Sequence, residues 1–193
     1  MISAIILAAG QSKRMGEPKM LLPWGKVIVI EHVITTFLQA GIEDVVVVTG
    51  GAREQVEQAI GAYPVRSVHN REYATGEMLS SLQEGLRTMP PQAEAALIGL
   101  GDQPQVEEGN VRLICGTYQE SKSRLVVPSF QRRRGHPWLV TRALWDELLA
   151  MKPPGSPRDF LNRHAGEIQY VNTDTDSILA DLDTPEDYKN SRP

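Results

Sequence analysis

The chain has 193 residues, of which 41% are apolar and 23% are charged, and its formal net charge is −4. This length and composition suit one globular domain with a full hydrophobic core, so we expect a single domain over residues 1–193. The acidic balance and the lack of a long basic stripe exclude a nucleic-acid track. A small ligand is favoured over a polymer.

The cysteine content and the hydropathy of the chain indicate a compartment. The single cysteine, Cys115, has no intrachain partner for a disulfide, which fits a reducing environment. No stretch is long and apolar enough to cross a membrane, and the N-terminal apolar run is too short for a secretion signal. We therefore expect a cytoplasmic protein, with neither a membrane nor a nucleic acid among its partners.

In chain order, apolar runs typical of buried strands alternate with segments whose apolar residues recur at helical spacing. The expected strands are 2–7, 45–48, 64–68, 95–100, 125–127, 168–171 and 178–182. The expected helices are 27–40, 53–60, 78–89, 106–120, 141–151 and 158–164, and Thr184 opens a last one. Thr141 and Thr184 are the expected N-caps, and Pro185 suits the first helical position. The alternation predicts an α/β fold with a mostly parallel, Rossmann-like sheet covered by helices on both faces.

Ligands of such sheets bind at the carboxyl ends of the strands. Four segments directly follow apolar runs, namely the loop after Leu7, Thr49-Gly50, Gly101-Asp102 and the region of Asp183. We expect these segments to converge on one edge of the sheet.

The stretch from Ile2 to Lys19, ISAIILAAGQSKRMGEPK, runs from a buried strand into a glycine-containing loop with two cations. Small residues such as Gly10 let backbone N–H groups approach phosphate oxygens, because no Cβ intervenes. Arg14 can fork onto two oxygens, and Lys19 can serve as a point charge. An ordinary strand-to-helix connection is the alternative, but this concentration of residues favours an anion site. The motifs GxxxxGK[ST] and GxGxxG are absent, so the loop is neither a P-loop nor a dinucleotide fingerprint.

Two further stretches carry carboxylates suited to a metal. Asp102, in Leu100-Gly101-Asp102-Gln103-Pro104, follows a buried strand between Gly and Pro, and Mg²⁺ prefers such oxygen ligands together with substrate phosphates. The alternative for Asp102 is a turn residue that bonds its own backbone. Asp181 and Asp183 alternate along the expected strand 178–182 and should point to the same face. A capped helix start explains the acidic residues that follow them.

Two polar segments are candidates for binding other parts of the substrates. A loop ending at Gly76 opens a helix with hydroxyls in its first turn, at Ser80 and Ser81, and such a start can bind an anion or a base edge. Capping explains these serines equally well. The run from Arg132 to Pro137 is typical of a solvated loop, but its arginines could hold a phosphate on an acceptor.

The N-terminal motif, LAAGxSxRMGxPK, resembles the signature loop of the nucleotidyltransferases that include the molybdenum cofactor cytidylyltransferases and guanylyltransferases. Ala8, Ala9, Gly10, Ser12, Arg14, Met15, Gly16 and Lys19 fall on it. The GDQP run at Asp102, the DLDTPEDY run from Asp181 and the RGHP run from Arg134 resemble family motifs in family order. The resemblance covers nearly the whole chain and implies a fold of the nucleotide-diphospho-sugar transferase type.

The resemblance implies a role for each matched residue. The implied nucleotide-binding residues are Leu7, Ala8, Ala9, Gly10, Arg14, Met15, Gly16, Lys19, Thr49, Gly50, Gly76, Ser81 and Asp102. The implied metal ligands, for Mg²⁺, are Asp102, Asp183 and Asp181, and the implied catalytic residues are Arg14, Lys19 and Asp102. The implied second-substrate residues are Arg134, Gly135, His136 and Pro137.

The LAAG opening resembles the cytidylyl members, since guanylyl members carry LAGG. It implies transfer of CMP from CTP to a molybdopterin-type molybdenum cofactor with release of pyrophosphate, and a recipient molybdoenzyme as a further partner. One departure weakens the choice of acceptor and base. Cytidylyl members often carry an acidic-Gly-Ala-Arg stretch where this chain has Gly155-Ser156-Pro157-Arg158-Asp159. The alternatives are another nucleotide such as GTP, a sugar or alditol phosphate as the acceptor, and a non-catalytic cofactor carrier.

Overall fold

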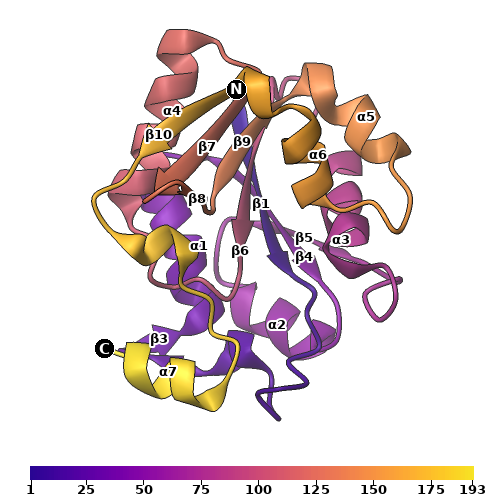
Figure 1. The fold of residues 1–193 in the computed structure, drawn as a ribbon. Coiled ribbons are helices and arrows are strands. Elements are labelled where there is room, and N and C mark those ends of the chain that lie inside the picture. Colours follow the sequence, from indigo (N-terminus) through magenta and orange to yellow (C-terminus); the bar gives the residue numbers. More distant parts are fainter.

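The computed structural model describes all 193 residues. One eight-stranded sheet runs through the molecule in the order β10-β7-β9-β6-β1-β4-β5, with β8 paired to β7 (Figure 1). Its strands are β1 (Ile2–Ala8), β4 (Asp44–Thr49), β5 (Arg66–His69), β6 (Ala95–Leu100), β7 (Leu125–Phe130), β8 (Arg133–Arg134), β9 (Trp138–Thr141) and β10 (Ile168–Asn172). A separate small hairpin joins β2 (Pro23–Trp24) to β3 (Val27–Ile28).

The sheet is mostly parallel, as predicted. β1 pairs in parallel with β4 and β6, β4 with β5, and β7 with β10. β9 lies antiparallel between β6 and β7, so the strands on either side of it still run in the same direction. The carboxyl ends of β1, β4, β5, β6, β7 and β10 therefore meet at one edge of the sheet.

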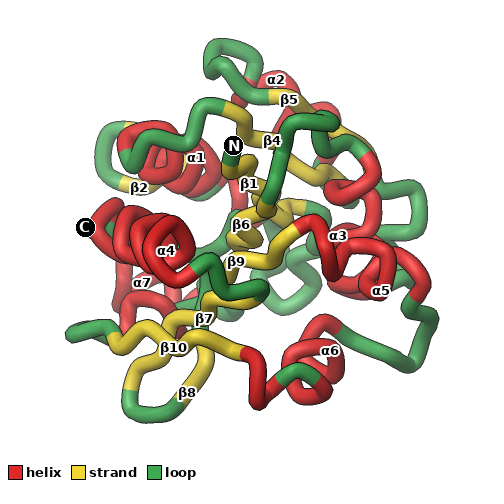
Figure 2. Tube along the Cα trace, turned by 90° about the horizontal axis from the view of Figure 1, so that it is seen from above, coloured by secondary structure: helices red, strands yellow, loops and turns green.

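Helices cover both faces of the sheet (Figure 2). The helices are α1 (Val29–Gln39), α2 (Arg53–Ile60), α3 (Glu77–Arg87), α4 (Glu108–Ser121), α5 (Trp145–Ala150), α6 (Pro157–Arg163) and α7 (Pro185–Ser191). Buried side chains of α1, α2 and α4 pack against one face, and those of α3, α5 and α6 pack against the other. Both cores are mostly aliphatic, with a few aromatic side chains, and are almost fully buried, because strands covered on both faces carry continuous apolar runs. No helix is both long and apolar enough to span a bilayer.

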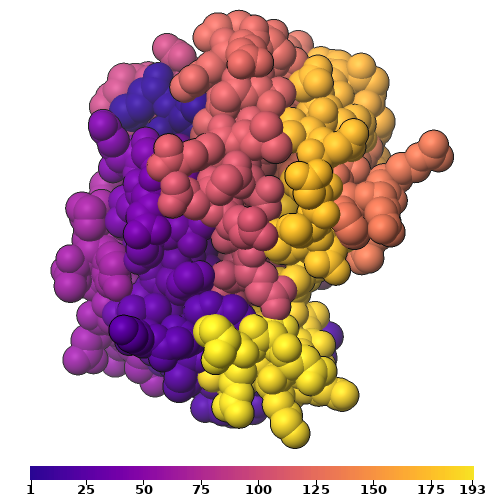
Figure 3. Space-filling model, turned by 90° about the vertical axis from the view of Figure 1, so that its left-hand side faces the viewer, coloured from indigo at the N-terminus to yellow at the C-terminus, as the bar shows by residue number.

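The C-terminal segment packs onto the N-terminal one. Leu182 is buried with Met15, Trp24 and Val29, and the Tyr188 hydroxyl donates to the Pro23 carbonyl over 2.6 Å. Figure 3 shows the yellow C-terminal atoms against the indigo N-terminal atoms. This contact brings Asp181 and Asp183 to the loop that follows β1.

The expected strand 178–182 is wrong. A 3₁₀ turn, η4 (Asp176–Leu179), is followed by extended chain outside the sheet. Ile178 and Leu182 are buried in two separate places, and this burial produced the strand-like pattern. The Ile178 carbonyl accepts from the His136 N–H over 3.0 Å, and the Leu182 N–H donates to the Asp102 carbonyl over 3.1 Å.

The helix expected over 141–151 is shorter in the structure, where α5 begins at Trp145, and Thr141 does not cap it. Thr141 ends β9, and a 3₁₀ turn, η2 (Arg142–Leu144), precedes α5. The Thr141 side chain makes no capping hydrogen bond, and its backbone N–H donates to the Arg124 carbonyl over 3.0 Å at the sheet. By contrast, Thr184 caps α7 as predicted, and the Asp187 N–H donates to its hydroxyl over 3.2 Å.

The basic run expected to be a loop contains a hairpin. β7 extends to Phe130, and β8 pairs antiparallel with its end. Gln131 and Arg132 form the turn with φ angles of 48° and 66°, which suits a two-residue hairpin connection. The hairpin holds the arginines at the edge where the strands end.

Candidate functional site

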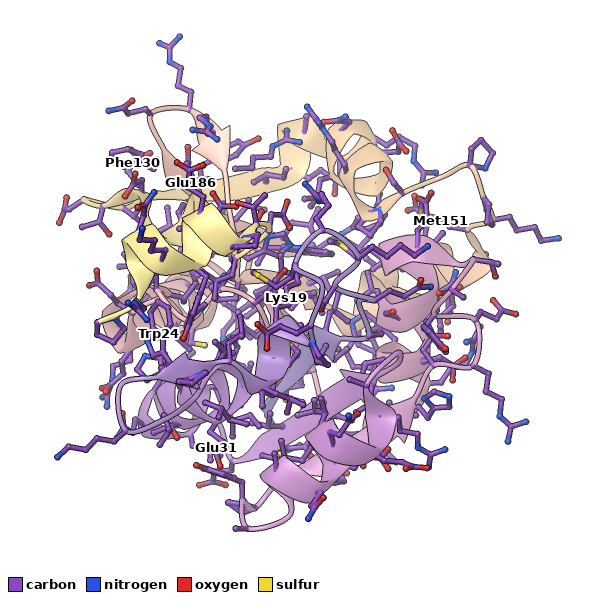
Figure 4. All side chains as sticks on the ribbon, turned by 90° about the horizontal axis from the view of Figure 1, so that it is seen from below. Lys19, Trp24, Glu31, Phe130, Met151 and Glu186 are labelled. Atoms are coloured by element: carbon purple, nitrogen blue, oxygen red, sulfur yellow. The ribbon has the colours of Figure 1, made fainter.

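A cavity of about 400 Å³ lies at the carboxyl ends of β1 and β6, and we call it the central cavity. It is lined by Leu7, Ala9, Gly10, Lys19, Met20, Tyr73, Glu77, Met78, Ser81, Leu100, Asp102, Asp181 and Asp183. Figure 4 looks onto this edge of the sheet and shows Lys19 near its middle, with Phe130 nearer the rim. Residues predicted from distant parts of the sequence thus meet in one place.

Lys19 is the centre of a network of opposite charges. Its ammonium group donates to the Asp102 carboxylate and lies 3.3 Å from Asp183 Oδ1. Arg14 Nη2 donates to Asp183 Oδ2 over 2.9 Å. The side chains of Lys19 and Asp102 are only 12% and 14% exposed, whereas that of Arg14 is 70% exposed. Burial by itself lowers the pKa of Lys19, but Asp102 and Asp183 outweigh it and raise that pKa, so the ammonium stays protonated.

The loop between β1 and Lys19 is held by its own backbone. Ser12 adopts a left-handed φ of 50°, and its carbonyl accepts from the N–H groups of Met15 and Gly16 at 3.0 and 3.1 Å. The Ser12 hydroxyl accepts from the Lys19 N–H over 3.1 Å. These bonds fix the start of η1 (Lys19–Leu21), and therefore the position of the Lys19 side chain.

The loop borders a second hollow of about 500 Å³, which we call the loop cavity. It is lined by Gly10, Gln11, Ser12, Lys13, Gly16, Glu17, Pro18, Gly51, Ala52, Tyr73 and Ala74. Gly50, at the end of β4, supports it from beneath, because a Cβ there would lie 2.3 Å from the Ala9 carbonyl oxygen. Gly10 and Tyr73 line both this cavity and the central cavity.

Asp102, Asp181 and Asp183 form a crowded acidic group in the central cavity. Burial raises the pKa of Asp181 first, and the charges of Asp102 and Asp183 raise it further. Gln103 Nε2 opposes this shift by donating to Asp181 Oδ1 over 2.6 Å. Carboxylates brought together against their repulsion fit a hard divalent cation. No group of three or more His, Cys, Asp or Glu side chains is arranged to hold a metal alone, so oxygen atoms of a ligand would complete the shell.

Asn70 ties the serines of α3 to the loop after β5. Its side-chain amide donates to the hydroxyls of Ser80 and Ser81 over 2.8 and 3.0 Å, and Asn70 is 1% exposed. Neither serine caps the helix, because the N-cap position is Gly76. Ser81 lines the central cavity, and Gly76 supports it by packing against Ser80.

A third hollow of about 1000 Å³ lies beside the hairpin, and we call it the arginine cavity. It is lined by Met78, Ser129, Arg132, Arg133, Arg134, Gly135, His136, Trp138, Pro157, Arg158, Leu161, Asn162, Tyr170 and Asn172. Gly135 is required where it stands, because a Cβ there would lie 2.4 Å from the Ile178 carbonyl oxygen. Burial lowers the pKa of His136 to about 4, so its imidazole is neutral near pH 7. Met78 lines both this cavity and the central cavity, so the two hollows adjoin at its side chain.

Some predicted residues lie behind the cavities. Ala8, Met15, Thr49 and Pro137 are buried and line none of the three. Thr49 hydrogen-bonds Glu57 over 3.2 Å beneath the sheet edge. These residues support the backbone of the site rather than face a ligand in this structure.

Sequence reasoning missed several lining residues. Tyr73, Glu77 and Met78 precede or open α3, where Glu77 adopts a left-handed φ of 51°. Arg158 and Tyr170 bring α6 and β10 into the arginine cavity. Of these residues, the sequence offered a signal only for Arg158. The capping pattern Ser156-Pro157 places it in the first turn of a helix.

The chain is similar to a known protein family and to individual proteins over almost its whole length. Residues 4–168 match the profile of the family described as the MobA-like NTP transferase domain. The molybdenum cofactor cytidylyltransferase of Escherichia coli K12 is 28% identical over 188 residues, which cover 97% of this chain and 93% of that protein. Nicotine blue oxidoreductase of Paenarthrobacter nicotinovorans is 27% identical over 197 residues, covering 96% and 93%.

Solved structures show the same architecture. Rv0371c of Mycobacterium tuberculosis H37Rv superposes with a TM-score of 0.84 at 28% identity, over 98% of this chain and 96% of that one. A complex of Rv0371c with manganese superposes with a TM-score of 0.80 at 27% identity, over 98% and 96%. These likenesses confirm the predicted nucleotidyltransferase fold.

Proposed function

The chain belongs to the MobA-like NTP transferase domain family, and from this premise we propose that it transfers CMP from CTP to a molybdopterin-type molybdenum cofactor. Nucleotidyl transfer is the reaction class of the family. The choice of CTP and of this acceptor is supported by the cytidylyltransferase relative and by the LAAG opening. The observation that carries the proposal is the cation and carboxylate network at Lys19, in a cavity that shares Met78 with the arginine cavity.

The nucleotide occupies the loop and central cavities in this proposal. Backbone N–H groups of Gly10 and its neighbours, together with Arg14 and Lys19, bind the triphosphate. Tyr73, which lines both cavities, offers a ring for the base or ribose. Ser81 contributes a hydroxyl whose orientation is set by Asn70.

The chemical step needs positioning and charge neutralisation rather than a covalent enzyme intermediate. An oxygen of the acceptor phosphate attacks the α-phosphorus of CTP. The bond between that phosphorus and the oxygen that bridges to the β-phosphate breaks, and the electron pair leaves on pyrophosphate. Arg14 and Lys19 stabilise the charge that develops on this leaving group. The acceptor phosphate is already ionised near pH 7, so the neutral His136 binds substrate and need not act as a base.

Asp102 and Asp183 are the proposed ligands of Mg²⁺, with Asp181 beside them. The ion supplies neutralisation of the phosphate charges. The crowded carboxylates support this assignment, and the manganese complex of Rv0371c supports a divalent metal in the fold.

The experiment is a measurement of pyrophosphate release with Mg²⁺ and each of CTP, GTP, ATP and UTP, with and without molybdenum cofactor. Release that requires both CTP and the cofactor is the expected result. Release with GTP and the cofactor would change the nucleotide. Release with a sugar or alditol phosphate in place of the cofactor would change the acceptor. Nucleotide binding without release in any mixture would contradict catalysis and favour a cofactor carrier.

A further inference from the structure

The two carboxylates proposed as metal ligands are already paired with cations of the protein. Asp102 accepts from the Lys19 ammonium, which also lies 3.3 Å from Asp183 Oδ1. Arg14 Nη2 donates to the other carboxylate oxygen of Asp183 over 2.9 Å. The side chains of Lys19 and Asp102 are 12% and 14% exposed, so little water screens their contact. These two carboxylates are therefore neutralised by side chains of the protein itself.

The Lys19 ammonium takes the place that a metal ion would need. It bridges Asp102 and Asp183, as a divalent cation bound to both carboxylates would do. The ammonium and the ion carry charges of the same sign and repel each other at contact distances, so they cannot share this position. Binding of the metal therefore requires the ammonium to leave Asp102.

The Lys19 side chain can move while its backbone stays in place. The Lys19 N–H donates to the Ser12 hydroxyl over 3.1 Å, and η1 begins at this residue, so the backbone is fixed. The ammonium is carried on a flexible four-carbon stem and has three rotatable donors. Lys19 lines the central cavity together with Ala9 and Gly10 of the loop after β1, where the triphosphate is proposed to bind. A phosphate there offers the ammonium a new anion in place of Asp102.

We infer that Lys19 exchanges Asp102 and Asp183 for the triphosphate when the nucleotide binds, and that this exchange makes the site select the metal–nucleotide complex over either part alone. The inference rests on the proposed function, which assigns the metal to these carboxylates and the triphosphate to the loop. Metal alone would leave the ammonium without an anion, and nucleotide alone would leave Asp102 unpaired beside phosphate oxygens. When both bind, every charge has a partner, so each ligand raises the affinity for the other by the same factor.

The test compares the affinity of the full chain and of Lys19→Met for Mn²⁺ alone, measured by electron paramagnetic resonance without nucleotide. We expect Lys19→Met to bind Mn²⁺ about tenfold more tightly than the wild type, because the carboxylates no longer have to release a cation. The same variant should bind the complex of Mn²⁺ with the α,β-methylene analogue of CTP more weakly, because a contact to phosphate is lost. These two shifts have opposite signs, whereas a purely structural role of Lys19 would weaken both.

Lys26→Met is the matched control, because Lys26 is an exposed lysine that lines none of the three cavities. It removes the same charge from the chain and should leave the affinity for Mn²⁺ unchanged. Equal tightening in both variants would show a general effect of net charge and would overturn the inference. Unchanged or weaker Mn²⁺ binding in Lys19→Met would overturn it as well. Thermal unfolding checks that each variant folds, and Lys19→Gln, which keeps an N–H donor for Asp102, replaces Lys19→Met if that variant does not.

The two proposals fail in different ways, because the measurement with Mn²⁺ alone contains neither nucleotide nor acceptor. Tighter Mn²⁺ binding by Lys19→Met, without pyrophosphate release by the wild type in any mixture, would overturn the proposed transfer and leave the exchange at Lys19 standing. Release with CTP and the molybdenum cofactor, together with no tightening in Lys19→Met, would overturn only the exchange.

Discussion

The central cavity and the arginine cavity differ in whether their cationic side chains are paired with carboxylates. In the central cavity Lys19 has two anionic partners, Asp102 and Asp183, and Arg14, outside the cavity lining, pairs with Asp183. In the arginine cavity the cations lack anionic partners. A balanced network suits a ligand that arrives with a cation of its own, such as a metal–nucleotide complex. An unbalanced one suits a ligand whose anionic groups arrive without a metal.

The supports of the two cavities also differ. Close backbone packing fixes the central and loop cavities, because Gly50 lies against Ala9 and the Gly101 N–H donates to the Leu7 carbonyl over 2.9 Å. The wall of the arginine cavity formed by α6 is supported by titratable groups, since His164 lies between Glu147 and Glu167. We therefore expect the backbone packing beneath the first two cavities not to depend on pH, and the support of α6 to respond to it.

The largest effect is expected for Asp102→Asn. Loss of this carboxylate leaves Lys19 with Asp183 alone and removes the proposed metal ligand closest to Lys19. Pyrophosphate release should fall by about 10²–10³-fold, the size expected when one electrostatic contact to a transition state is lost. The rate under saturating CTP and acceptor is the measurement, and far-UV circular dichroism checks the fold.

A matched amide variant serves as the control for Asp102→Asn. Glu84→Gln removes a carboxylate that pairs with Arg87 over 2.6 Å on the surface of α3, and its rate should equal that of the wild type. A rate for Asp102→Asn within about twofold of the wild type would remove Asp102 from the proposed mechanism.

Two neighbouring glycines test the supporting role of backbone packing. A Cβ at Gly50 would lie 2.3 Å from the Ala9 oxygen and 2.7 Å from Ala9 Cα, so the loop must move. Gly50→Ala should lower the free energy of unfolding by about 1–3 kcal/mol and weaken nucleotide binding. At Gly51 the nearest atoms would be 3.4 Å away, so Gly51→Ala should stay within about 0.5 kcal/mol of the wild type. Urea unfolding measures both, and equal effects would show that this close approach is unimportant.

Much of the central cavity could be predicted from the sequence because its residues directly follow buried strands. Gly10 follows β1 and Asp102 follows β6, and the parallel sheet then brings the two together without further information. Lys19 could be included because Pro18-Lys19 belongs to the same short run. Local sequence and sheet geometry agree here, so the prediction needed no tertiary detail.

The rest depended on contacts that no local pattern records. Asp181 and Asp183 do share a cavity, but through an irregular segment anchored by Leu182 rather than through a strand. Tyr170 and Asn162 reach Arg134 only because β10 and α6 pack beside the hairpin. Burial of single side chains such as Ile178 imitates a strand pattern, which is why the expected strand 178–182 was wrong.

The smallest effect is expected at His164, which supports α6. Its Nδ1 lies 2.9 Å from Glu167 Oε1 and its Nε2 lies 2.8 Å from Glu147 Oε2. Arg163 and Arg124 pair with the same two glutamates, at 3.1 and 3.3 Å. The hydrogen bond to Glu167 raises the pKa of His164 above 6.5, burial opposes this shift, and Glu147 adds to it.

Because the pKa of His164 is higher in the folded state than in the unfolded state, its contribution to stability is complete below about pH 6.5 and is lost as the pH rises through the folded value. His164→Gln should therefore destabilise the protein more at about pH 5.5 than at about pH 9, as measured by urea unfolding at each pH. His32 provides the matched comparison, because burial lowers its pKa. His32→Gln should show the opposite trend, with its stability relative to the wild type improving as the pH falls. A difference between wild type and His164→Gln that does not vary with pH would mean that His164 supports α6 by packing on Phe160, 4.7 Å between ring centres, rather than by its charge.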